Sequence, residues 1–100
     1  TLHLSFMVVE ARGTKMLPTI EPEQTVLVCL MDKSVKSGDV IAYKKPFYDL
    51  DGEGYIAFRR VKEVQEEGLL LTCDMQLAVE QEDYVSKEDI LGKVVLINID

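Results

Sequence analysis

The apolar residues of this chain occur in short runs that are rich in β-branched residues, and each run ends in charged or glycine-containing sequence. The runs lie at residues 2–11, 25–31, 40–43, 54–64, 68–75 and 92–99. Runs of this length and composition are typical of β-strands, whereas an amphipathic helix needs a longer segment with a period near 3.6. The sequence therefore predicts a mostly-β fold of about seven strands.

Turn signals separate the runs, and helix signals are few. Gly38 and Asp39 predict a turn before the strand at residue 40, and the acidic segment 49–54 predicts a hairpin-type turn. Pro46 is expected to stop its strand from pairing further. Thr19 could start one short helical turn. Residues 86–92 have a serine at the cap position, acidic residues next and a terminal glycine, which predicts one or two turns.

Length and charge limit the class of protein. One hundred residues correspond to one domain, residues 1–100, with a modest core that would benefit from a stabilising neighbour. The formal charge is -7, from 18 acidic and 11 basic side chains. Repulsion from phosphate argues against docking on nucleic acid, so we expect no nucleic-acid partner through this domain.

Neither a metal nor a cofactor is expected. Cys29 and Cys73 have no CxxC spacing and His3 is the only histidine, so a zinc site lacks ligands. The acidic segment 49–54 lacks the distant glutamate and flanking helices of a calcium loop. Both cysteines lie in apolar runs, which favours buried free thiols in a reducing compartment. A disulfide between them would require adjacent strands and is left open.

No apolar run approaches the roughly 20 residues that span a bilayer, and the first residues lack a signal-peptide pattern. We expect a soluble domain that is cytoplasmic rather than exported. Any membrane association would come from sequence outside the chain, where an anchor or a further domain could lie.

The order of the motifs resembles a known family. The segment GTKMLPTI is followed by TVLVCL, VKSGDVIAY, IAFRRVKEV, GLLLTCD and ILGKVVLI, over residues 8–97. This series resembles the serine–lysine peptidase fold shared by signal peptidase I and the self-cleaving domain of LexA-type repressors. The resemblance implies a LexA/signal-peptidase-like complex β-fold with one or two short helical turns.

Both catalytic positions of that family are substituted. In the family, serine precedes the loop methionine as nucleophile, and a lysine on a later strand is the general base. Met16 and Pro18 fix the register, so that Lys15 falls on the serine and Arg59 on the lysine. The resemblance thus implies a peptidase-like domain with no catalytic residues at the dyad positions.

The substitutions remove both the nucleophile and the general base. Lys15 has no hydroxyl, and the Arg59 guanidinium stays protonated because its pKa exceeds about 12. Rescue by Thr14 or Thr19 beside Lys15 would need a rearranged loop. Two cations about 4 Å apart at an effective dielectric near 20 would repel by about 4 kcal/mol. We expect solvent exposure near acidic residues to relieve this, and a carboxylate such as Asp74 or an anionic ligand are the alternatives.

The favoured function is binding of an extended peptide, or service as an accessory to a processing partner, without catalysis. Gly13, Thr14, Met16, Leu17 and Pro18 are the predicted peptide-binding residues, and Arg60 and Asp74 the predicted supporting residues. Two alternatives are an active serine-type peptidase with an unusual nucleophile and the regulatory domain of a phage-type repressor. The expected partner is a peptide or protein segment, and a homodimer is left open.

Overall fold

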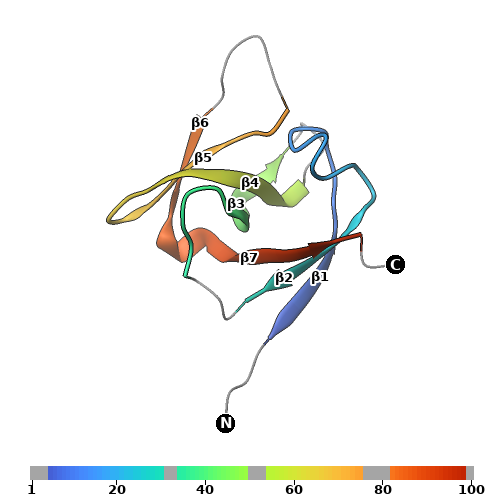
Figure 1. The fold of residues 1–100 in the computed structure, drawn as a ribbon, viewed down its shortest axis with the longest axis horizontal. Coiled ribbons are helices and arrows are strands. Elements are labelled where there is room, and N and C mark those ends of the chain that lie inside the picture. Colours follow the sequence, from blue (N-terminus) through green and yellow to red (C-terminus); the bar gives the residue numbers. More distant parts are fainter. Residues whose placement is uncertain (1–4, 31–33, 50–53, 76–81, 99–100) are drawn as a thin grey trace.

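The computed structural model describes residues 5–30, 34–49, 54–75 and 82–98, with only the backbone described at residues 46–49. Its elements are β1 (Phe6–Glu10), β2 (Thr25–Cys29), β3 (Val40–Asp49), β4 (Gly54–Val64), β5 (Gly68–Thr72), β6 (Glu82–Ser86), the 3₁₀ helix η1 (Lys87–Asp89) and β7 (Ile90–Ile97) (Figure 1). The prediction of a mostly-β fold of about seven strands is confirmed. Over the described ranges no helix is long and apolar enough to cross a membrane.

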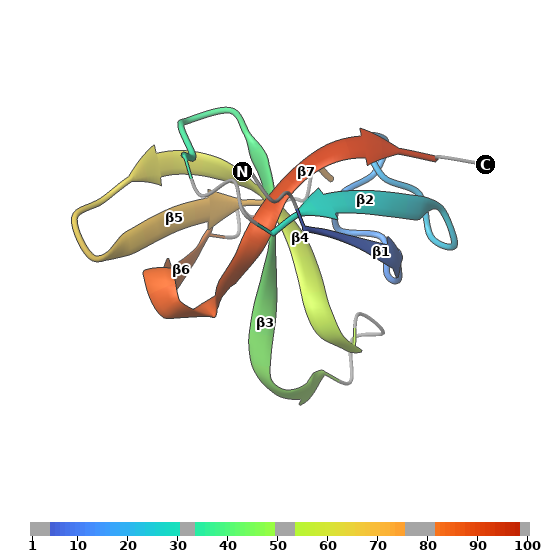
Figure 2. The same ribbon diagram turned by 90° about the horizontal axis from the view of Figure 1, so that it is seen from below.

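The seven strands form one antiparallel sheet in the order β1-β2-β7-β3-β4-β5-β6. The last strand, β7, pairs with β2 on one side and with β3 on the other. It therefore joins the N-terminal pair β1–β2 to the rest of the sheet. Figure 2 shows β5 and β6 on one side, β1 and β2 on the other, and the β3–β4 hairpin between them.

Two apolar clusters fill the interior. The loop-side core comprises Ala11, Met16, Ile20, Val26, Val28, Ala42 and Phe58. The β5-side core comprises Ile41, Tyr43, Ala57, Val61, Leu69, Leu71, Val85 and Ile90. Successive residues of a strand point to opposite faces, so β3 and β4 contribute to both cores and are covered on both sides. Short β-branched runs suit such doubly covered strands.

Residues 82–92 differ from the sequence prediction. The strand β6 was not located in the sequence because only Tyr84 and Val85 of its five residues favour a strand. Residues 87–89 form a single 3₁₀ turn, and the Ser86 side chain makes no capping hydrogen bond. Gly92 lies within β7 and does not end a helix, because the chain enters the sheet at Ile90.

The β3–β4 hairpin is longer than the sequence predicted. β3 continues past Pro46, with its regular pairing to β4 interrupted after Lys44 and resumed where Asp49 pairs with Gly54. The predicted hairpin turn lies in the acidic segment 49–54, which lacks the features of a calcium loop, and its residues 50–53 are outside the described residues. The predicted turn at Gly38 is confirmed: Gly38 has φ 97° and the Asp39 N–H donates to the Lys36 carbonyl.

Neither cysteine forms a disulfide in the described part of the chain. Cys29 is buried in β2, and Cys73 is half-buried directly after β5. Because β2 and β5 are not neighbours in the sheet, the adjacent-strand condition for a disulfide is not met.

The close approach of β7 to β2 predicts the effect of a substitution at Gly92. A Cβ atom at Gly92 would overlap the Cys29 carbonyl oxygen and lie 2.9 Å from the carbonyl carbon, and backbone atoms cannot move aside cheaply. We expect Gly92→Ala to lower the free energy of unfolding by about 1–3 kcal/mol in urea denaturation. Val95→Ala, at an exposed position of the same strand, should cost less than about 1 kcal/mol. Equal stability of the two variants would contradict this packing.

Candidate functional site

The loop that connects β1 to β2 carries the motif singled out in the sequence. Gly13 has φ 79°, a conformation that favours glycine. The Leu17 N–H then donates to the Thr14 carbonyl at 3.1 Å, and the Ile20 N–H donates to the Met16 carbonyl at 2.9 Å. These bonds fold the loop into consecutive turns, within which the Leu17–Pro18 peptide bond is cis.

Apolar side chains attach the loop to the sheet. Met16 and Ile20 are buried in the loop-side core beside Phe58 of β4. The predicted peptide-binding role of Met16 therefore needs correction: the side chain is in the core, where it fixes the loop and does not reach a surface. The physical reason is that burying the methionine side chain in the core removes its apolar surface from water, which is favourable.

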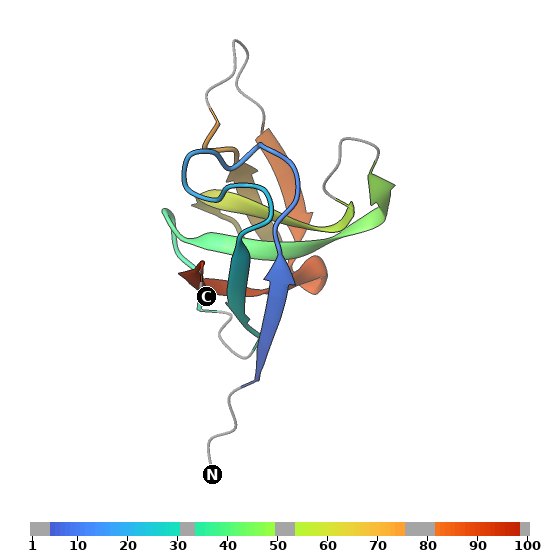
Figure 3. The same cartoon turned by 90° about the vertical axis from the view of Figure 1, so that its right-hand side faces the viewer.

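A carboxylate provides a second attachment of the loop to the sheet. Asp74, just after β5, accepts hydrogen bonds from the Thr19 hydroxyl and from Nε and Nη2 of Arg60, the latter two at 2.9 and 2.7 Å. The Met75 N–H donates to the Lys15 carbonyl at 2.9 Å. Figure 3 shows this loop, in blue, beside the chain segment that follows β5. The two predicted supporting residues, Arg60 and Asp74, are thus brought together as a bidentate pair.

This network sets the protonation of its members. The hydrogen bonds from Arg60 hold the pKa of Asp74 below its ordinary value, burial opposes this shift, and the Thr19 hydroxyl adds to it. Asp74 in turn raises the pKa of Arg60. Asp74 is therefore ionised at neutral pH and is a weak base.

Arg59 lies in a different environment from its neighbour. Its side chain is 1% exposed, Nη1 donates to the Phe58 carbonyl at 2.8 Å, and Nε lies 3.7 Å from the Asp83 carboxylate of β6. Strand alternation places it on the face of β4 that carries Ala57 and Val61. The expectation that solvent exposure relieves the charge of Arg59 is wrong, and its carboxylate neighbour in the structure is Asp83.

Lys15 is half-buried in the loop. The contacts described above connect this loop to β4 through Arg60, since Asp74 binds both Arg60 and Thr19. Proximity of the Lys15 ammonium to the Arg59 guanidinium stays a prediction.

A shallow pocket of about 420 Å³ lies beside the anchored loop, lined by Leu17, Pro18, Asp74 and Met75. Two of the five predicted peptide-binding residues, Leu17 and Pro18, line it. Gly13 and Thr14 belong to the same loop and are not among its lining residues. Met75 was missed by sequence reasoning, although its position next to Asp74 in the motif was the signal that could have found it.

The groups at the pocket favour binding of a ligand over nucleophilic attack on a peptide bond. The Thr19 hydroxyl donates its proton toward Asp74, but this carboxylate has a lowered pKa and already accepts two bonds from Arg60. A nucleophile needs a base that can remove its proton, and such a carboxylate is poorly suited to that task. In the part of the chain that the structure describes, no group of acidic, histidine or cysteine side chains could hold a metal ion.

Comparisons with protein-family models, with curated proteins and with solved structures find no significant match to this chain.

The Asp74 network predicts a pH-dependent contribution to stability. Because the pKa of Asp74 is lower in the folded chain than its unfolded value of about 3.9, the stabilisation is complete above that value and is lost as pH falls through the folded pKa. We expect Asp74→Asn to lower the free energy of unfolding by about 1–3 kcal/mol at pH 7. Its stability should also change less than that of the wild type between about pH 5 and pH 2, measured by urea denaturation at each pH.

Glu82→Gln is the matched control. Glu82 pairs with Lys62 at 3.1 Å, but both side chains are exposed, so the loss should stay below about 1 kcal/mol. If Asp74→Asn were no more destabilising than Glu82→Gln, Asp74 would not be the anchor of the loop.

Proposed function

We propose that this chain is a binding domain related to the signal peptidase I and LexA-type peptidases, which takes up an extended peptide and does not cleave it. The order of the sequence motifs supports the relationship, and the mostly-β fold is compatible with it. The single observation that carries the proposed binding is the pocket formed by Leu17, Pro18, Asp74 and Met75 beside a loop that is held from two sides.

The pocket suits one uncharged side chain of a peptide. Three of the four lining side chains that the structure describes are apolar, and the charge of Asp74 is compensated by the bidentate bond from Arg60. Because Met16 and Ile20 anchor the loop in the core, the pocket is preorganised and little ordering is required on binding.

The backbone of the peptide can be held by strand addition. β1 is an end strand of the described sheet, in which it pairs with β2 alone, and it leads directly into the loop. Its outward-facing Phe6 and Val8 are 49% and 60% exposed. An added strand would bond to the free edge of β1 through its main chain, while these two side chains offer apolar contacts.

Cleavage is not part of the proposal, because the positions that match the family's nucleophile and base hold Lys15 and Arg59. A guanidinium cannot accept a proton at neutral pH, whatever it faces. The Arg59 side chain is moreover engaged by the Phe58 carbonyl and lies near Asp83.

The test is selection of binders from a display library of random linear peptides, followed by titration of a selected peptide and mass spectrometry of the mixture. We expect saturable binding with the peptide recovered intact. Leu17→Asp should weaken binding about tenfold or more, because it places a second carboxylate in the pocket beside Asp74.

Val95→Asp is the control, since it introduces the same charge at an exposed apolar position outside the pocket. Two results would refute the proposal. Hydrolysis of the bound peptide by the wild-type chain would restore the active-peptidase alternative. Equal binding by Leu17→Asp and Val95→Asp would show that the pocket is not the peptide-binding site.

A further inference from the structure

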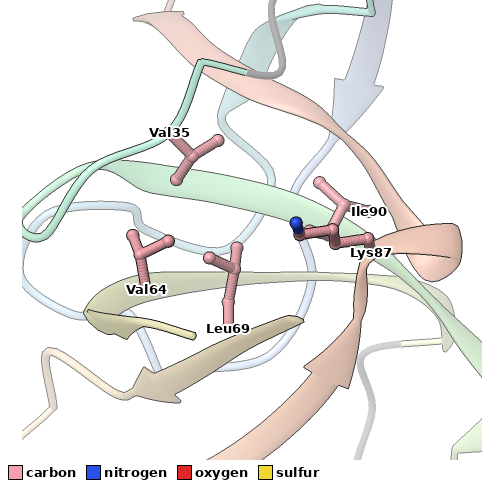
Figure 4. A pocket seen from close by; sticks show the side chains of 5 residues that line it. All are labelled: Val35, Val64, Leu69, Lys87 and Ile90. Atoms are coloured by element: carbon pink, nitrogen blue, oxygen red, sulfur yellow. The ribbon is translucent and has the colours of Figure 1, made fainter. Parts of the chain in front are cut away.

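A second pocket lies on another part of the molecule, and none of its described lining residues belongs to the first. It has a volume of about 270 Å³ and is lined by Val35, Val64, Leu69, Lys87 and Ile90. These residues come from the segment before β3, the end of β4, the start of β5, η1 and the start of β7. Figure 4 shows the four apolar side chains around the opening and the Lys87 side chain extending its ammonium toward their centre.

The walls of this pocket are held by the fold. Leu69 and Ile90 are buried in the β5-side core, and Val35 packs against the same core. The Lys87 N–H donates to the Glu67 carbonyl at 3.2 Å, which fixes η1 over the turn between β4 and β5. The pocket is thus formed before any ligand enters.

We propose that this pocket binds a small apolar monocarboxylate, with the hydrocarbon against the four apolar side chains and the carboxylate on the Lys87 ammonium. Apolar walls with one convergent charged group are the usual composition of a small-molecule site. Among the described residues the structure records no ion pair of the Lys87 ammonium. An anionic head group with an apolar tail is the ligand chemistry that matches both parts of the lining.

The volume sets the size of the ligand. At about 30 Å³ for each water-sized unit, 270 Å³ holds about nine such units. A straight-chain carboxylate of about eight carbons fills that space, whereas longer chains would extend into solvent.

The net charge of -7 works against anions at long range, and Glu88 and Asp89 follow Lys87 on η1. At physiological ionic strength, however, charges beyond about 8 Å are largely screened, while a direct ion pair at the pocket is screened less. Binding should therefore persist at that ionic strength, because the attraction that matters is local.

The experiment is a methyl NMR titration of the whole chain with straight-chain carboxylates from butanoate to decanoate. We expect saturable shifts of the methyl groups of Val35, Val64, Leu69 and Ile90. Affinity should rise about three- to fourfold with each added methylene and level off near octanoate, when the pocket is full. Octan-1-ol, which has no charge, should bind about fivefold more weakly than octanoate.

Three variants make the assignment specific. Lys87→Gln should reduce octanoate affinity about fivefold and leave octan-1-ol affinity unchanged, whereas Lys36→Gln, an exposed lysine outside the lining, should change neither. Val64→Phe should block both ligands by filling the pocket from a position that is already 48% exposed, so the fold should tolerate it.

The proposal is overturned if octanoate gives no saturable shift up to about 5 mM, if the shifts fall on other methyl groups, or if Lys87→Gln binds octanoate as the wild type does. None of these outcomes bears on peptide binding, because the two pockets have separate lining residues and separate variants.

Discussion

The carboxylate of Asp74 holds together three segments that are distant in sequence: the loop after β1, strand β4 and the chain after β5. It accepts bonds from Thr19 and, twice, from Arg60, whose remaining nitrogen Nη1 donates to the Gly38 carbonyl at 2.7 Å. A charge taken partly out of water needs such compensation, and removing one member would leave the others buried without it. The position of Leu17 and Pro18, and hence the shape of the pocket beside them, follows from this network together with the burial of Met16.

Most of the fold could be predicted because most of its strands are rich in apolar and β-branched residues. The run at residues 54–64 matches β4 at both ends, since valines, isoleucine and aromatic residues recur along it. β6 could not be found in this way, because it begins with two acidic residues and only Tyr84 and Val85 favour a strand. Pro46 did not end β3, since an irregularity in the pairing accommodates a residue that has no N–H to donate.

The candidate site was predictable in part. The resemblance placed Arg60 and Asp74 in supporting positions, and their contact is present. It gave no means of foreseeing that Arg59 would be buried within reach of Asp83, because that depends on β6, the strand missed in the sequence. The pocket at Lys87 was also invisible in the sequence, since its apolar walls come from segments that meet only in the folded chain.

The position of β1 at the end of the sheet has a dynamic consequence. Five residue pairs with β2 hold this strand, and no second strand covers its other edge in the described sheet. Edge segments of this kind open locally well before the whole domain unfolds. The bonds from Met75 to Lys15 and from Thr19 to Asp74 hold the loop without involving any residue of β1. Amide hydrogens of β1 can therefore exchange with solvent in fluctuations that leave the loop in place, so the strand edge and the pocket would open on separate timescales.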